Sequence, residues 1–219
     1  MNAPDRLIQN PEQLSQNRIK LEKNKLILAE GPDALYFFVW ACREYRTTDD
    51  VQVLSFGGVN ELHDYLSQLT KVEGYYRVDT IVIARDAEND ATSAVASIKD
   101  SMIRAGMPTP QNPFEYTRCG IPKTAFCIFP GPDQSKGTLE QLCLSTVERD
   151  PIMICVDDFL KCVQSKGEGV PRPHKNRLHC FLSGKDKYVG STIGQASYKK
   201  AWDPRHQALL PFKTIIEQM

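Results

Sequence analysis

The residues "KLILAEGPDALYFFVWACREY", 25–45, change from an apolar run to an amphipathic one within a few positions. The apolar run predicts a short buried strand over 25–29, which ends just before Glu30. Pro32 suits the first turn of a helix, and apolar side chains then recur with helical spacing to about Tyr45. This stretch therefore predicts a strand and a helix with a carboxylate at their junction.

The same alternation of apolar runs and helix-period segments continues over the first 130 residues. The predicted strands cover 25–29, 51–56, 78–86 and 124–130. The predicted helices between them cover about 32–45, 59–70 and 92–105. Alternation of this kind predicts an α/β fold with a parallel sheet flanked by helices, in which the loops after the strands share one edge.

The pattern becomes helical after "PGPDQSKG". Helices are predicted at 138–147, at 150–165, around 174–183 and within 205–218. We therefore expect three parts: a polar N-terminal arm (1–22), an α/β core (23–148) and a helical extension packed on the core (149–219).

The composition is typical of a folded, soluble protein. The 219 residues are 41% hydrophobic and carry 27 basic and 27 acidic side chains, which excludes a disordered chain. Overall neutrality neither supports nor excludes a nucleic acid partner, because a local basic patch is enough to bind one. No run reaches the roughly 18 apolar residues of a membrane span, and the N-terminus lacks the apolar segment of a signal peptide. We expect a cytoplasmic protein with no membrane partner.

The cysteine spacing predicts buried, reduced thiols, because the number is odd, no CxxC pair occurs and most lie in apolar runs. The seven are Cys42, Cys119, Cys127, Cys143, Cys155, Cys162 and Cys180. The candidate ligands for zinc are His174, His179 and Cys180. Two histidines five residues apart do not share a helix face, and no second ligand cluster is nearby, so we do not expect a zinc site.

Carboxylates follow the predicted strands at the edge where open α/β sheets bind their ligands. Glu30 follows the first strand, and Asp86 and Glu88 follow the third, with Asp90 close behind. Like charges this close raise one another's pKa unless a cation neutralises them, and all-oxygen ligands favour Mg²⁺ or Mn²⁺. Asp86 and Glu88, two residues apart, would project to the same side of an extended backbone and hold one ion together.

Three short motifs at successive strand ends resemble the Toprim family, the catalytic domain of topoisomerases, bacterial primases, small ribonucleases and overcoming-lysogenization-defect nucleases. They are "AEGPDA" (29–34), "SFGGVNEL" (55–62) and "IARDAEND" (83–90). They are similar to the family's Glu-Gly pair, Gly-rich turn and Asp-x-Asp. The resemblance covers about residues 25–147, and "GTLEQLCL" (137–144) with the helical tail is similar to a little-characterised Toprim-like branch.

The resemblance implies a Toprim-like fold and a nuclease that hydrolyses DNA or RNA with Mg²⁺ or Mn²⁺. It implies that Glu30 acts as general acid or base and that Lys175 assists the transition state. The residues it implies as metal ligands are Glu30, Asp86, Glu88 and Glu140. The second-tier candidates are Asp33, Asp90, Gly57, Gly58 and Arg177.

The resemblance also implies a role in anti-phage defence with a partner ATPase. That ATPase would be a separate protein, because the chain has no Gly-x-x-x-x-Gly-Lys-Ser/Thr loop. Whether the chain forms a homo-oligomer stays open at this point, as does the choice between DNA and RNA.

Two departures from the family pattern keep other functions open. Ala34 stands where most relatives have an acid, with Asp33 one place earlier, and the third motif has Glu88 in place of its second aspartate. A catalytically silent subunit that binds a partner or nucleic acid is therefore the alternative. A phosphatase or receiver-like domain with Asp86 as phosphoacceptor is a weaker alternative, because receivers carry their acidic pair after the first strand.

Simpler interpretations of the same residues also stay open. Glu30 suits a helix start, where an acid interacts well with the helix dipole, and Glu140 suits the first turn of a later helix. The acids after the third strand and the glycine pair after the second are both common in turns. Isolated basic residues such as Lys175 and Arg177 are most often solvated.

Overall fold

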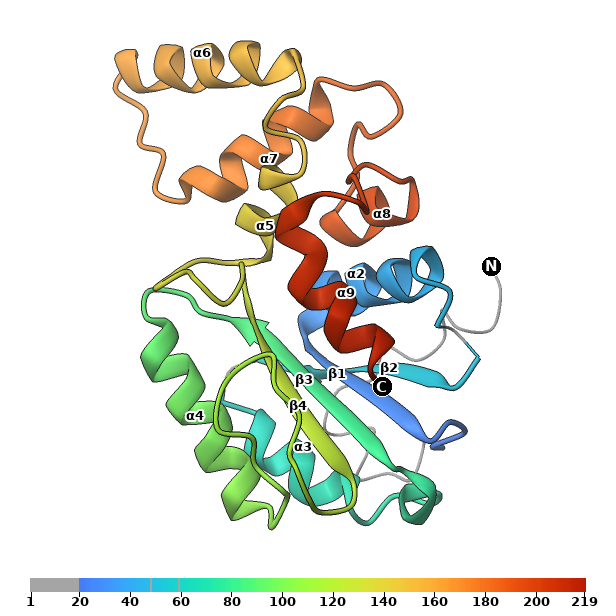
Figure 1. The fold of residues 1–219 in the computed structure, drawn as a ribbon. Helices are drawn as coiled ribbons and strands as arrows, with labels where there is room; N and C mark the ends of the chain where they lie inside the picture. The colour runs from blue at the N-terminus through green and yellow to red at the C-terminus, as the bar shows by residue number, and fades with distance from the viewer. Residues whose placement is uncertain (1–19, 48, 59) are drawn as a thin grey trace.

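A four-stranded parallel sheet forms the centre of the computed structural model, which describes residues 20–47, 49–58 and 60–219 (Figure 1). The strands are β1 (Lys25–Glu30), β2 (Val51–Gly57), β3 (Thr80–Asp86) and β4 (Lys123–Phe129), in the order β2-β1-β3-β4. Every neighbouring pair is parallel. The predicted α/β class with a parallel sheet between helices is thereby confirmed. Residues 1–19 of the expected arm lie outside the described residues.

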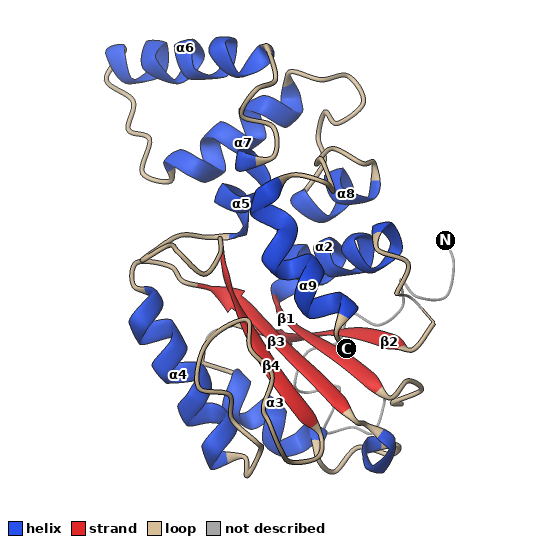
Figure 2. Ribbon diagram, viewed as in Figure 1, coloured by secondary structure: helices blue, strands red, loops and turns tan. Residues whose placement is uncertain are grey.

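Both faces of the sheet are covered, which explains why the strands are continuous apolar runs. Leu26 and Leu28 of β1 contribute to the core beneath α3 (Leu62–Leu69) and α4 (Ala91–Arg104). Ile27 and Ala29 point to the opposite core, which includes α2 (Gly31–Glu44). Figure 2 shows the sheet between these two layers of helices.

The chain after β4 is helical, as predicted. Its helices are α5 (Leu139–Ser145), α6 (Ile152–Ser165), α7 (Pro173–Ser183), α8 (Ile193–Tyr198) and α9 (Leu210–Glu217). Short 3₁₀ turns occur at Tyr75–Arg77 and Gln207–Leu209. Figure 1 shows α5, α6 and α7 beyond the carboxyl ends of the strands, while α9 returns to the face of the sheet.

Aromatic side chains join α9 to the sheet. The ring of Phe212 in α9 stacks on that of Phe129 in β4 with centroids 5.1 Å apart, and Phe37 of α2 meets both rings edge-on. Offset and edge-on ring pairs are worth about 0.5–1.5 kcal/mol beyond the area they bury. The last helix is therefore part of the core of the domain.

Some boundaries and one helix differ from the sequence predictions. The helix expected from 59 begins at Leu62, and the strand expected from 78 begins at Thr80. Helix α8 was not predicted, because its six residues are too few to show an amphipathic period. The signal that marks its start is a capping box, in which the side chains of Thr192 and Gln195 each bond the other residue's backbone N–H.

The prediction of buried thiols is wrong for Cys119, Cys155 and Cys162, which are exposed. Cys155 and Cys162 lie on the outer side of α6, a helix that buries only Met153 and Val156. The other cysteines are buried or half-buried, and all seven are free thiols. No helix among the described residues is both long and apolar enough to cross a bilayer.

Candidate functional site

Two adjoining pockets lie at the carboxyl edge of the sheet. The larger, which we call the charged pocket, measures about 500 Å³ and is lined by Asp86, Glu88, Thr138, Glu140, Arg172, Pro173, His174 and Lys175. The smaller, which we call the Glu30 pocket, measures about 200 Å³ and is lined by Glu30, Gly31, Pro32, Asp33, Ala34, Asp86, Phe129, Leu139, Glu140 and Ile193. Asp86 and Glu140 line both pockets, so the two form one continuous region.

Asp86 is the last residue of β3, and its side chain points toward the start of α5. One carboxylate oxygen, Oδ1, accepts a hydrogen bond from the backbone N–H of Leu139 at 2.8 Å. Burial raises the pKa of Asp86 to about 8, although the Leu139 N–H lowers it. The negative charges of Glu140, Glu30 and Glu88 add to the rise, in that order of size. A bound cation would offset these effects.

Glu30 occupies the position before the first residue of α2, but its side chain makes no capping hydrogen bond to that helix. Oε2 of Glu30 instead accepts a weak hydrogen bond from the backbone N–H of Asp86 at 3.4 Å. Burial raises its pKa, while Arg85 and the Asp86 N–H act in the opposite direction. Glu30 therefore stands at the start of α2, as the simpler interpretation expects, while its carboxylate contacts the backbone of Asp86.

Arg85 is a site residue that the sequence analysis missed. Its side chain is 5% exposed, and its Nε lies 3.7 Å from Oε2 of Glu30. Its Nη1 donates a hydrogen bond to Ser97 Oγ in α4 at 3.2 Å, while Nε has no hydrogen-bond partner among the described residues. A buried guanidinium needs a counter-charge nearby, and Glu30 supplies it. The available signal was a charged residue inside the apolar run "TIVIARD".

Glu88 departs from the extended backbone that we expected. Its φ is +53°, in the left-handed region that non-glycine residues rarely occupy. Two backbone hydrogen bonds with Gly137 fix it there: the Glu88 N–H donates at 2.9 Å and its carbonyl oxygen accepts at 2.8 Å. The expectation that Asp86 and Glu88 share one side of a strand is therefore wrong, although both line the charged pocket. Strained backbone held in this way is common at functional sites.

Glu140 reaches both pockets from the first turn of α5. The capping box of that helix, formed by Thr138 and Gln141, sets where the helix begins. The half-buried Glu140 carboxylate then lies close enough to Asp86 to be the largest charge effect on it. Asp33 lines the Glu30 pocket and accepts a hydrogen bond from the backbone N–H of Gly194 at 3.0 Å, which connects α2 to α8.

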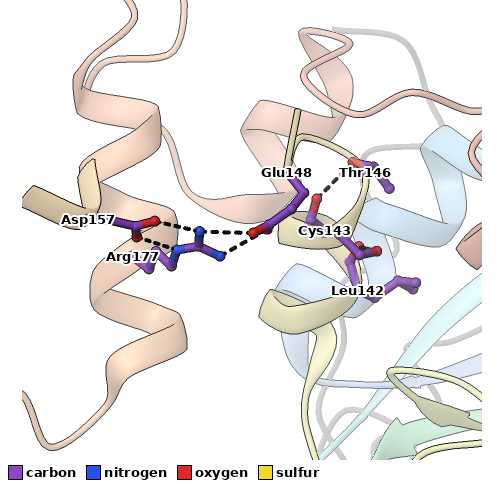
Figure 3. Close-up of polar contacts among 7 residues, drawn as sticks. Leu142, Cys143, Thr146, Glu148, Asp157 and Arg177 are labelled. Atoms are coloured by element: carbon purple, nitrogen blue, oxygen red, sulfur yellow. Dashed lines mark hydrogen bonds and ion pairs between the residues drawn. The ribbon is translucent and has the colours of Figure 1, made fainter. Parts of the chain in front are cut away.

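Among the basic candidates, Lys175 lines the charged pocket and Arg177 does not. Figure 3 shows the Arg177 guanidinium between Glu148 and Asp157. It donates two hydrogen bonds to Glu148, at 2.9 and 3.0 Å, and two to Asp157, at 2.7 and 2.9 Å. Its charge is already compensated, so Arg177 has a structural role in place of the expected one.

Three other second-tier candidates also lie outside both pockets. Asp90 is exposed and caps α4, accepting a hydrogen bond from the Thr92 N–H at 2.9 Å. Gly57 has φ +88°, and the Gly58 N–H donates to Oε2 of Glu61 at 3.3 Å. Asp90 therefore serves a helix cap, and the glycine pair forms a tight turn.

The carboxylates do not form a complete metal cage. Within the described part of the chain, no three His, Cys, Asp or Glu side chains lie close enough together to hold a metal ion. The expected joint site of four carboxylates is therefore not assembled among the described residues. Mg²⁺, however, is commonly held by one or two carboxylates together with waters and substrate phosphates. Asp86 and Glu140 have the donor chemistry for a site of that kind.

Searches of curated proteins and of solved structures found no match to this chain. A family model described as a protein of unknown function (DUF3226) matches residues 24–219, which include both sheet and helical extension. The chain therefore belongs to the DUF3226 family.

Proposed function

We propose that this protein is a divalent-metal-dependent phosphodiester hydrolase, a nuclease, on a Toprim-like scaffold. One observation carries the proposal: Glu30, Asp86, Glu140 and Lys175 come from β1, β3, α5 and α7, yet all line two adjoining pockets at the carboxyl edge of the sheet. In open α/β sheets this edge is where ligands bind. Side chains of these types, brought together from distant parts of the chain, suit the chemistry of a phosphate ester.

Asp86 and Glu140 are the pair that we propose to hold Mg²⁺ or Mn²⁺. They line both pockets, and Glu140 raises the pKa of Asp86 more than any other charge does. Two like charges in a partly buried site favour a divalent cation between them. When bound, such an ion would polarise a phosphate ester and lower the pKa of a bound water.

Glu30 is the proposed proton carrier. Burial raises its pKa above that of an ordinary glutamate, which is the direction that suits a general acid or base at neutral pH. Arg85, buried against it, opposes that rise and stabilises the ionised form, which accepts a proton. Lys175, which lines the charged pocket from α7, would interact with the negative charge that develops on the phosphate.

A catalytically silent binding subunit is the second candidate. Ala34 lines the Glu30 pocket at the position where most Toprim relatives have an acid, and the described residues contain no three-ligand metal group. Such a subunit would bind a partner or nucleic acid without hydrolysing a phosphodiester. The cleavage assay below separates it from the nuclease.

The test uses single-stranded DNA, duplex DNA and total transfer RNA as substrates, each with Mg²⁺, Mn²⁺ or EDTA. We expect cleavage that requires the metal and falls at least about 100-fold in Glu30→Gln and in Asp86→Asn, because each removes a proposed reacting group. Asp186→Asn is the control, since Asp186 is exposed and lines neither pocket. Equal cleavage by all four proteins would refute the proposed active site, and no cleavage by any would favour the silent subunit.

A further inference from the structure

The charged pocket has two walls of opposite charge that do not neutralise each other. Asp86, Glu88 and Glu140, from the end of β3, the turn after it and the start of α5, form its acidic wall, and Arg172 and Lys175, from the start of α7, form its basic wall. Among the described residues, no ion pair joins the two walls or engages either of these basic side chains. Arg172 and Lys175 are both exposed, so their charged groups are accessible to an anion that enters the pocket of about 500 Å³.

The basic wall is held in place by the rest of α7. Leu178, Phe181 and Leu182 are buried in the core, and Arg177 bonds to Glu148 and Asp157. Further along the same region, Lys185 also pairs with an acid, Asp150. Arg177 and Lys185 are thus paired with acids, whereas Arg172 and Lys175 at the start of α7 line the pocket.

We propose that Arg172 and Lys175 form a phosphate-binding arm that holds the backbone of a nucleic acid strand across the charged pocket, without reading its bases. This inference rests on the proposed nuclease function and deepens it. A phosphodiester together with a divalent cation carries the charges that both walls require: the cation suits the acids and the phosphate suits the arm.

The composition of the pocket supports contact with the sugar-phosphate backbone of a nucleic acid. Among the described residues, its lining includes no Phe, Tyr or Trp on which a base could stack. Thr138 and His174 are the remaining polar side chains. Phosphate contacts position a strand but carry no sequence information, so we expect binding that is independent of sequence.

The test measures binding apart from cleavage. Fluorescence anisotropy gives the Kd of labelled single strands, one of thymidine only and one of mixed sequence, in Ca²⁺ at several salt concentrations. Ca²⁺ is a hard ion with the same preference for oxygen ligands as Mg²⁺, and a denaturing gel shows that the strand stays intact. The variants are Arg172→Gln, Lys175→Gln, the double variant, and Lys166→Gln as the control.

Lys166 is exposed at the end of α6 and lies outside the pocket, so its substitution makes the same charge change elsewhere. We expect each arm substitution to reduce the slope of log K against log salt by about 0.7, the effect of one phosphate contact in a single strand. The double variant should lose both contacts. The control should match the wild type, and both strands should bind with similar Kd.

Three results would overturn the proposal of a phosphate-binding arm. They are an unchanged Kd in the double variant, an equal loss of affinity in Lys166→Gln, and a strong preference for one of the two strands. If the proposed nuclease function is wrong, the cleavage and binding assays give a different combination of results. If the wild type cleaves nothing with Mg²⁺ or Mn²⁺ but the double variant loses binding, the arm stands and the hydrolase does not. If cleavage requires the metal but the double variant has the same Kd as the wild type, the hydrolase proposal stands and the arm proposal does not.

Discussion

At the scale of single residues, Asp86 is the side chain on which the site depends. It ends β3, accepts a hydrogen bond from the start of α5 and lies among three other carboxylates. Its position after an apolar strand was enough to predict it from the sequence. Its burial was not, because that depends on α5, which follows about 50 residues later and approaches only in the folded chain.

The raised pKa of Asp86 predicts how stability changes with pH. The folded state binds the proton up to about pH 8, while the unfolded chain releases it near 3.8, so the free energy of unfolding falls as pH rises between these values. One such group contributes a slope of up to about 1.4 kcal/mol per pH unit. Urea unfolding in EDTA from pH 5 to 8 should show this slope in the wild type. Asp86→Asn should lose it, and an identical slope in both proteins would contradict the assignment.

Arg85 and Glu88 show where residue patterns gave too little information. Arg85 is a charged residue inside an apolar run, and only the folded chain shows that it is buried beside Glu30. Glu88 looked like a continuation of the strand, yet its two backbone hydrogen bonds with Gly137 turn the chain at that point. Both depend on contacts between segments distant in sequence, and short motifs do not encode such contacts.

At the scale of elements, α8 has a larger role than its length suggests. It packs against α2, and the Gly194 N–H donates to Asp33 beside the Glu30 pocket. The close approach of the two helices depends on the absence of a side chain at Gly194. A Cβ there would lie 2.6 Å from Cβ of Tyr36, too close for any ordinary contact.

We therefore expect Gly194→Ala to destabilise the fold by about 1–3 kcal/mol, the usual cost of overpacking. Thermal unfolding would show this as a loss of several degrees in Tm, since about 1 kcal/mol shifts Tm by roughly 2–4 °C in a domain of this size. Gly169→Ala is the matched control, because its Cβ would meet nothing within 4 Å. Similar Tm values for both variants would show that α8 does not pack closely on α2.

At the scale of the whole molecule, the order of strands and helices was predictable because every strand is buried on both faces and reads as an apolar run. The layout of the helical extension was not. Helix α7 of the extension lies beyond the carboxyl edge of the sheet, and its start supplies Arg172 and Lys175 to the pocket, which Glu140 of α5 also lines. Helix spacing predicts which face is apolar, but it does not predict which charged turn will lie over the strand ends.

The central claim is that Asp86 and Glu140 together hold a divalent ion, and it can be tested without knowing the substrate. Electron paramagnetic resonance of free Mn²⁺, titrated with protein at pH 8, measures binding directly. We predict saturable binding by the wild type that weakens at least about tenfold in Asp86→Asn and in Glu140→Gln, because each loses a charged oxygen ligand. The Asp186→Asn control should bind as the wild type does. Mn²⁺ affinity that is unchanged in both Asp86→Asn and Glu140→Gln would contradict the account.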